Sequence, residues 1–209
     1  MDIQFPSREY AGYIFDLDGT LIDSMPAHFR AWTEGLRQAG FVHEFGEDFF
    51  YSLGGVPTAR IVEMLNERHG TEMDPLAVTH AKEEIYLTVL AEITVIEPVA
   101  AFARERKARG IPLAVASGGM RHVVRRSLEA TGLLDLFPII VTPEDVAHGK
   151  PAPDLFLLAA ERMKAPPREC LVFEDAEMGR RAAVAAGMDY VLVPSRVIPA
   201  PSAGTTGGS

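Results

Sequence analysis

From about residue 98 onward, short apolar runs alternate with stretches of helical periodicity, and this alternation constrains the fold more than any other feature. The apolar runs are rich in Val, Ile, Leu and Phe and show little polar alternation. Such runs are typical of strands buried on both faces of a parallel sheet, and repeated strand–helix units predict a doubly wound α/β fold with right-handed crossovers. The expected strands are Tyr13–Phe15, Ile111–Ala116, Phe137–Val141, Cys170–Phe173 and Tyr190–Val193, and the expected helices are 98–109, 120–131, 153–164 and 177–187.

Residues 22–93 break this rhythm and are predicted to form a small helical domain inserted after the first strand. Ser24 is placed to cap a helix at its N-terminus, a second helix fits 58–69, and Asp74-Pro75 is a typical start for a third. The predicted domains are a core of residues 1–21 and 94–195, a helical cap of residues 22–93 and a disordered tail of residues 196–209.

The balance of charge and the cysteine content narrow the partners and the compartment. Acidic residues outnumber basic ones by 29 − 20 = 9, which disfavours a nucleic acid or an anionic membrane as partner. One cysteine, Cys170, cannot form an internal disulfide, which favours a reducing compartment. Neither a signal peptide nor an apolar run of about 20 residues is apparent. We therefore expect a cytoplasmic protein. We also expect it to be a monomer.

Polar residues follow four of the predicted strands, where a doubly wound sheet places its ligands. Asp16 and Asp18 follow the first strand, Ser117-Gly118-Gly119 the second and Glu174-Asp175 the fourth, while Lys150 lies in the loop after the third. Each of these alone has an ordinary structural explanation, such as a turn, a helix cap or a solvated surface charge. Together they predict one rim that carries carboxylates, a hydroxyl and an ammonium group.

The pair Asp16 and Asp18 indicates phosphoryl transfer. One carboxylate can attack phosphorus and form an aspartyl-phosphate, while the other protonates the leaving oxygen and later deprotonates water. Lys150 would supply positive charge, and Ser117 with the amides of Gly118 and Gly119 would hold phosphate oxygens.

Glu174 and Asp175 complete a predicted metal site with Asp16 and Asp18. Carboxylates that converge on one point repel one another by about 4 kcal/mol per pair at 4 Å in an effective dielectric of 20. A hard divalent cation relieves that repulsion, and all-oxygen ligands favour Mg²⁺ over zinc. Cys170 is interpreted as a core residue rather than a ligand.

These ordered motifs resemble those of the haloacid dehalogenase superfamily over roughly residues 10–195, and the helical insert resembles the cap of its β-phosphoglucomutase-like branch. The resemblance implies a Rossmann-like core with strand order 5-4-1-2-3 and a Mg²⁺ cofactor. It also implies that Asp16 is the phosphorylated nucleophile and that Asp18 is the acid/base, with its backbone carbonyl on the metal. Asp18 argues against the metal-free dehalogenase reaction, because those members lack the second aspartate.

In this family the cap supplies substrate specificity, and six residues of the insert are candidates for contacts with substrate. They are Ser24, His28, Gly55, Thr58, Arg60 and Lys82. β-Phosphoglucomutases carry an arginine where Thr58 stands and use it to grip the second phosphate; Arg60 is a potential substitute. The pattern Val-Pro-Thr-Ala-Arg is more similar to that of sugar-phosphate phosphatases, including fructose-1-phosphate phosphatases.

We therefore predict a Mg²⁺-dependent phosphatase that acts on small sugar phosphates, with a hexose-phosphate mutase as the alternative. A catalytically silent binding module on the same fold is a third hypothesis, since fold alone does not fix function. It is disfavoured because none of the expected catalytic residues is missing.

Overall fold

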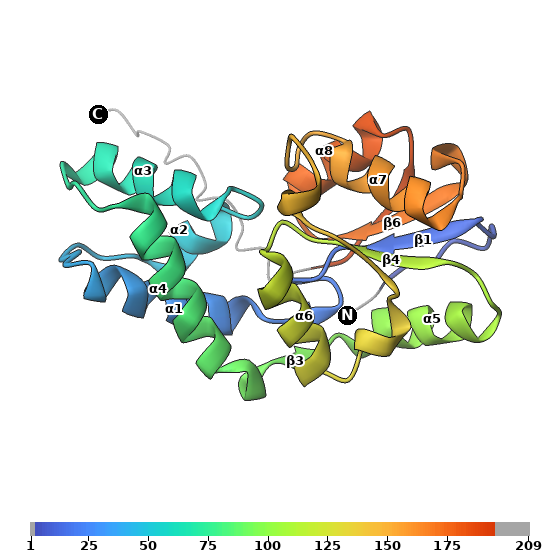
Figure 1. The fold of residues 1–209 in the computed structure, drawn as a ribbon, viewed down its shortest axis with the longest axis horizontal. Coiled ribbons are helices and arrows are strands. Elements are labelled where there is room, and N and C mark those ends of the chain that lie inside the picture. Colours follow the sequence, from blue (N-terminus) through green and yellow to red (C-terminus); the bar gives the residue numbers. More distant parts are fainter. Residues whose placement is uncertain (1–2, 195–209) are drawn as a thin grey trace, which may run out of the picture.

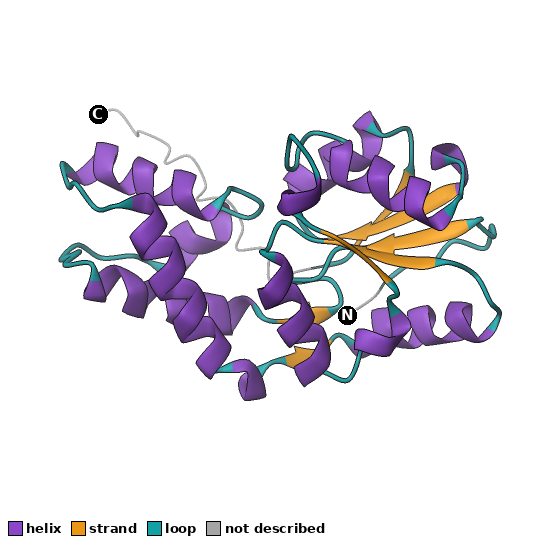
Figure 2. Cartoon of the chain, in the orientation of Figure 1, coloured by secondary structure: helices purple, strands orange, loops and turns teal. Residues whose placement is uncertain are grey.

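A five-stranded parallel sheet forms the centre of the computed structural model, which describes residues 3–194 (Figures 1 and 2). Its strands are β1 (Gly12–Phe15), β4 (Leu113–Ala116), β5 (Ile139–Val141), β6 (Cys170–Glu174) and β7 (Asp189–Leu192). They lie in the order β5-β4-β1-β6-β7. When only these five strands are numbered along the chain, the order β7-β6-β1-β4-β5 becomes 5-4-1-2-3, so the family resemblance implied the observed topology.

Register places β1 at the centre of the sheet, between β4 and β6. Tyr13 pairs with Leu113 on one side and with Leu171 on the other, and both pairings are parallel. β1, β4 and β6 are buried along their whole length, as their unbroken apolar sequences predict.

Helices cover both faces of this sheet (Figure 1). The α-helices of the described chain are α1 (Met25–Gln38), α2 (Glu47–Ser52), α3 (Thr58–His69), α4 (Pro75–Thr88), α5 (Glu97–Ala108), α6 (Arg121–Ala130), α7 (Asp154–Met163) and α8 (Glu177–Ala185). The 3₁₀ turns are η1 (Leu90–Glu92), η2 (Leu134–Leu136), η3 (Pro143–Asp145) and η4 (Pro167–Glu169). Side chains of α7 and α8 pack on one face of the sheet and those of α5 and α6 on the other. The predicted α/β architecture is confirmed.

Helices α1 to α4 form a separate group that contains no strand (Figure 2). Its own apolar core includes Trp32, Phe45 and Phe50. The N-terminal end of α1 and the C-terminal end of α4 pack into the core of the sheet instead, through residues such as Ala27 and Tyr86. The helical group is therefore packed against the sheet-side core at one end.

Three details of this segment differ from the sequence-based expectation. A short helix, α2, and a two-stranded ribbon of β2 (Ile22–Asp23) with β3 (Thr94–Val95) were not predicted. Two-residue strands are too short to show a periodic pattern. The two strands of this ribbon are also separated in the sequence by the whole insert. Ser24 precedes α1, but its side chain makes no capping bond, because its hydroxyl donates to Asp18 instead. Asp74 does cap α4, accepting from the amide of Leu76 at 2.9 Å.

The predicted tail of residues 196–209 lies outside the described residues. Within residues 3–194, no helix combines the length and apolar character needed to cross a bilayer.

Candidate active site

The residues singled out after the strands meet at one edge of the sheet. Asp16 directly follows β1, Ser117 follows β4, and Glu174 is the last residue of β6. Lys150 reaches the same edge from the loop after β5. Because parallel strands present their carboxyl ends at a common rim, four distant segments deliver side chains to one place.

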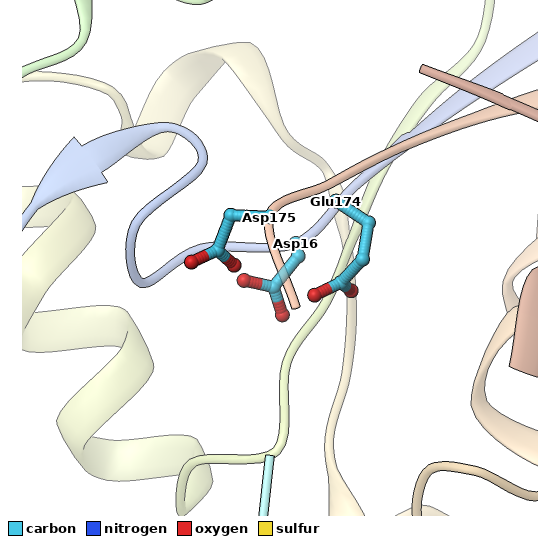
Figure 3. A group of neighbouring side chains, drawn as sticks. All are labelled: Asp16, Glu174 and Asp175. Carbon is cyan, nitrogen blue, oxygen red and sulfur yellow. The ribbon is translucent and has the colours of Figure 1, made fainter. Parts of the chain in front are cut away.

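Three carboxylates form the centre of this site (Figure 3). Asp16, Glu174 and Asp175 each place an oxygen so that the three atoms lie within 4.8 Å of one another. Asp16 and Glu174 are buried, with 7% and 2% of their surface exposed. The carboxylates come from two adjacent strands, β1 and β6, which explains why residues so distant in sequence lie side by side.

Two glycines leave the space that these carboxylates occupy. A Cβ at Gly19 would lie 2.3 Å from Asp175 Oδ2, and Gly19 also has a φ of +79°. A Cβ at Gly179, in the first half of α8, would lie 2.0 Å from Glu174 Oε2. The backbone therefore confines the positions of Asp175 and Glu174 from two sides.

Lys150 lies against two of the three carboxylates. Its Nζ donates to Asp16 Oδ1 at 2.5 Å and to Glu174 Oε2 at 2.7 Å. The lysine side chain is only 6% exposed. One ammonium group thus offsets part of the negative charge of three carboxylates, and hydrogen bonds to both acids fix its position.

The excess negative charge changes the pKa values of the site. Burial and the nearby charge of Glu174 raise the pKa of Asp16 well above its usual range, and the same causes raise the pKa of Asp175 to about 7. Burial alone would lower the pKa of Lys150, but Asp16 and Glu174 raise it instead. In the absence of a cation, the site therefore retains protons that isolated carboxylates would lose.

The donor set fits Mg²⁺. All three clustered groups offer carboxylate oxygens, and the one metal-capable cluster among the described residues contains neither histidine nor cysteine. Three carboxylates against one ammonium leave a formal charge of −2, which a divalent cation would neutralise. Hard oxygen ligands of this kind suit Mg²⁺ better than zinc. Cys170 is fully buried, as expected for a core residue.

The carboxylate of Asp18 does not join this cluster. Its Oδ1 accepts from Ser24 Oγ at 2.6 Å and lies 3.1 Å from His28 Nε2. Burial would raise the pKa of Asp18, but the adjacent His28 and the hydrogen bonds from His28 and Ser24 hold it at about 2. Asp18 is thus ionised here, and Nε2 must carry the hydrogen of its bond because a carboxylate only accepts.

Ser117 is buried and lies at the start of the predicted phosphate loop. Its Oγ accepts from the amide of Gly119 at 3.0 Å. The Gly119 amide therefore has a partner within the loop in this structure. Gly118, the next residue of the loop, is exposed.

The six candidate residues of the insert divide into two groups. Ser24, His28 and Lys82 lie around Asp18: the first two bond to it directly, and the charge of Lys82 helps to lower its pKa. Burial and the charge of Lys82 lower the pKa of His28, and burial lowers that of Lys82. These three residues therefore link the start of α1 and the middle of α4 to Asp18.

The second group lies on the loop before α3 and on α3 itself. Gly55 touches α8, because a Cβ there would lie 2.7 Å from Met178 Cβ. Thr58 begins α3 and is half-buried. Arg60 is exposed and pairs with Glu63 and Glu67, both at 3.0 Å. The structure therefore brings the loop to the core but does not bring the guanidinium group of Arg60 to the carboxylates.

Two residues of this region were missed by sequence reasoning. Gly179 makes room for Glu174, and a glycine inside a helical pattern was the available signal. Tyr86 stacks on His28, with ring centroids 3.9 Å apart and planes 6° apart. No local signal could have identified Tyr86, because an aromatic residue on the apolar face of a helix usually belongs to the core.

Comparisons with known proteins agree with this geometry. The family model described as a haloacid dehalogenase-like hydrolase matches residues 10–187. Fructose-1-phosphate phosphatase YqaB of Escherichia coli (strain K12) is 38% identical over 186 residues, covering 89% of this chain and 97% of that protein. Hexitol phosphatase A of the same organism is 35% identical over 182 residues, covering 87% and 82%.

A similar solved structure is that of a CbbY variant from Rhodobacter sphaeroides in complex with xylulose-(1,5)bisphosphate. It has a TM-score of 0.78 and 28% identity, and the match covers 87% of this chain and 84% of that one. The similarity thus extends over the sheet and the helical insert together.

Proposed function

The chain belongs to the haloacid dehalogenase-like hydrolase family, and from that premise we propose that it is a Mg²⁺-dependent phosphatase of small sugar phosphates. Asp16 is the nucleophile that takes the phosphoryl group. Asp18 is the acid/base that protonates the leaving sugar oxygen and later takes a proton from water. The observation that carries this proposal is the cluster of Asp16, Glu174 and Asp175 around Lys150, since it pairs a nucleophile with the charge that a phosphate dianion requires.

The proposed reaction has two halves that return the protein to its starting state. In the first half, an oxygen of Asp16 bonds to phosphorus while the bond from phosphorus to the sugar oxygen breaks and Asp18 gives its proton to that oxygen. In the second half, Asp18 takes a proton from water, and the water oxygen displaces Asp16 from phosphorus. Against the effect of burial, the adjacent His28 and the hydrogen bonds from His28 and Ser24 lower the pKa of Asp18 and so favour its ionised form, which is the form that the second half uses.

Charge stabilisation comes from side chains on the same rim. Lys150, Ser117 and the Gly118 amide would bind the phosphate oxygens as negative charge builds up on them. Asp16, Glu174 and Asp175 would hold Mg²⁺, with Asp18 contributing its backbone carbonyl. Bound Mg²⁺ would offset the repulsion between the carboxylate nucleophile and the phosphate dianion.

The choice of sugar phosphates is supported by the relatives, since two of the similar proteins are named fructose-1-phosphate phosphatase and hexitol phosphatase. The state of Arg60 favours hydrolysis over mutase chemistry. A mutase must bind both phosphates of a bisphosphate. Arg60 is the candidate for the second phosphate, but its guanidinium group is paired with two carboxylates of its own helix. We propose residues 22–93 as the cap that encloses the sugar.

Phosphate release from a panel of substrates tests this proposal. Fructose 1-phosphate, hexitol phosphates, nucleotides and phosphoglycolate would be compared in Mg²⁺ and after chelation. We expect Mg²⁺-dependent release that favours the sugar and hexitol phosphates and is absent from Asp16→Asn. Equal rates with and without chelator would contradict the role of the metal, and a preference for nucleotides would contradict the substrate class.

A second arm addresses the mutase alternative. The protein would be incubated with β-glucose 1-phosphate and a bisphosphate primer, and glucose 6-phosphate and free phosphate would both be measured. We expect free phosphate to dominate. Faster formation of glucose 6-phosphate would replace the phosphatase with a mutase.

A further inference from the structure

A continuous chain of contacts runs from the core of the protein to Asp18. Ser127 on α6 bonds to the hydroxyl of Tyr86 on α4 at 3.0 Å, the Tyr86 ring stacks on His28 of α1, and His28 bonds to Asp18. Ser127 and Tyr86 are both fully buried. Four residues from four segments therefore connect the side of the sheet with the proposed acid/base.

The orientation of the His28 ring depends on this stacking. A histidine ring is usually oriented by hydrogen bonds at both nitrogens. Here Nε2 bonds to Asp18, whereas the buried Nδ1 has no hydrogen-bond partner among the described residues. One hydrogen bond constrains the plane of the ring less than two would. The face of Tyr86, nearly parallel to the imidazole, is the contact that fixes the plane.

The hydroxyl of Tyr86 fixes this plane relative to the core. The Tyr86 hydroxyl bonds to Ser127 and also interacts with Ser24. Removing it would take a partner from the buried Ser127 hydroxyl, which makes the bond between them costly to break. The backbone of α4 approaches α1 closely one turn earlier, where a Cβ at Gly35 would lie 3.3 Å from Lys82. Tyr86 is thus held in two ways, by the hydrogen bond of its hydroxyl to Ser127 and by the close packing of its helix on α1.

We propose that Tyr86 is a positioning residue for proton transfer: it fixes the plane of His28, and through His28 it fixes the carboxylate of Asp18 against the leaving oxygen. This inference rests on the proposed function, because it assigns Tyr86 to the proton-transfer step of that reaction. Tyr86 itself touches neither the clustered carboxylates nor, on this account, the phosphate.

Two aryl leaving groups of different acidity test the proposal. Phenyl phosphate requires a proton on its leaving oxygen, whereas p-nitrophenyl phosphate releases a much stronger acid and does not. The value of kcat/KM reports the steps up to departure of the leaving group. For Tyr86→Leu, we expect kcat/KM to fall for phenyl phosphate and to change little for p-nitrophenyl phosphate. The substrate ratio, which is kcat/KM for p-nitrophenyl phosphate divided by kcat/KM for phenyl phosphate, should rise by about tenfold or more, since a positioned acid contributes 10²–10⁴-fold.

Two further variants separate positioning from general damage. Val78→Ala makes a cavity elsewhere on α4, in the core of the helical group, and should leave the substrate ratio unchanged. In a His28→Ala background, Tyr86→Leu should produce no additional change in the ratio, because Tyr86 acts through His28. An independent loss in that background would overturn the inference.

Milder variants cover the case in which Tyr86→Leu does not fold. Tyr86→Phe and Ser127→Ala both remove the bond between these two residues and keep the aromatic ring, and Tyr86→Phe also removes the interaction of the hydroxyl with Ser24. Each should raise the substrate ratio by about threefold, and Ser127→Ala should add nothing to Tyr86→Phe, since the bond they share is already lost. Equal loss for both substrates, or no loss, would overturn the inference alone. If the unaltered protein hydrolyses no phosphate ester, the proposed function fails as well.

Discussion

Gly179 lies so close to Glu174 that a Cβ there would be 2.0 Å from the carboxylate Oε2. Gly179 is inside α8, where glycine lowers helix stability by about 1 kcal/mol relative to alanine. Helix propensity alone would therefore favour Gly179→Ala. The position of Glu174 opposes it, since the new methyl group and the carboxylate would occupy the same space.

We therefore expect Gly179→Ala to displace Glu174 and weaken Mg²⁺ binding by about 10–100-fold, the usual cost of disturbing the support of a metal site. The measurement is the Mg²⁺ concentration that gives half-maximal phosphatase activity. Gly46→Ala is the matched control, because a Cβ at Gly46 meets nothing within 4 Å. An unchanged Mg²⁺ requirement in Gly179→Ala would contradict the placement of Glu174 at the metal.

Lys150 supplies the second test, because its ammonium group bonds to both Asp16 and Glu174. Lys150→Met keeps the length of the side chain and removes the charge. We expect kcat to fall by about 10²–10³-fold, the size of effect seen when one preorganised stabilising group is lost. Lys107→Met, on the exposed surface of α5, is the control. A loss of less than about threefold would show that Lys150 does not stabilise the transferring phosphoryl group.

The raised pKa values of the acid cluster predict how stability depends on pH without metal. Burial and Glu174 raise the pKa of Asp175 to about 7 from 3.8, so the folded state binds this proton more tightly than the unfolded state. The contribution of this proton to the free energy of unfolding is therefore fully present below about pH 4 and is lost as the pH rises from there to about 7. Asp16 acts in the same direction.

The measurement is the Tm of the chelated protein and of the Mg²⁺-loaded protein across this pH range. Mg²⁺ competes with protons for the carboxylates, so we expect it to raise Tm much more at about pH 8 than at about pH 5. Asp175→Asn should remove part of the pH dependence of the chelated protein. A Mg²⁺ effect of equal size at both pH values would contradict this account.

The fold was predictable because burial on both faces leaves a strong signal in the sequence. The strand that became β6 was expected at Cys170–Phe173 and is observed at Cys170–Glu174. The ribbon of Ile22 with Val95 was not predictable, since it depends on contacts across the whole insert. Local sequence favours a helix-capping role for Ser24, but the tertiary bond to Asp18 prevails.

The site divides in the same way. The rim residues were predictable because each follows a strand, and parallel strands end at a common edge. Their exact partners were not: neither the hydrogen bonds of Lys150 nor the stacking of Tyr86 on His28 leaves a trace in local sequence. The position of Arg60 in the sequence made it a candidate for binding a second phosphate. On α3, however, its guanidinium group pairs with Glu63 and Glu67.

Arg60 therefore gives a prediction of little change. Arg60→Ala removes two exposed ion pairs, which contribute little to folding because solvent screens them. We expect kcat/KM for sugar monophosphates to remain within about twofold of the unaltered protein, since the guanidinium group does not serve the reaction. A large rise in KM would instead return Arg60 to the substrate site, with its ion pairs broken when substrate binds.

The central claim is that Asp16 carries the phosphoryl group, and acid quenching during turnover tests it most directly. Protein mixed with a sugar phosphate and Mg²⁺ would be quenched, and the phosphorylated residue would be identified by mass spectrometry after borohydride reduction of the acyl phosphate. We predict a phosphorylated Asp16 that disappears on chelation and is absent from Asp16→Asn. Phosphate on Ser117 or His28, or full phosphatase activity in Asp16→Asn, would contradict the account.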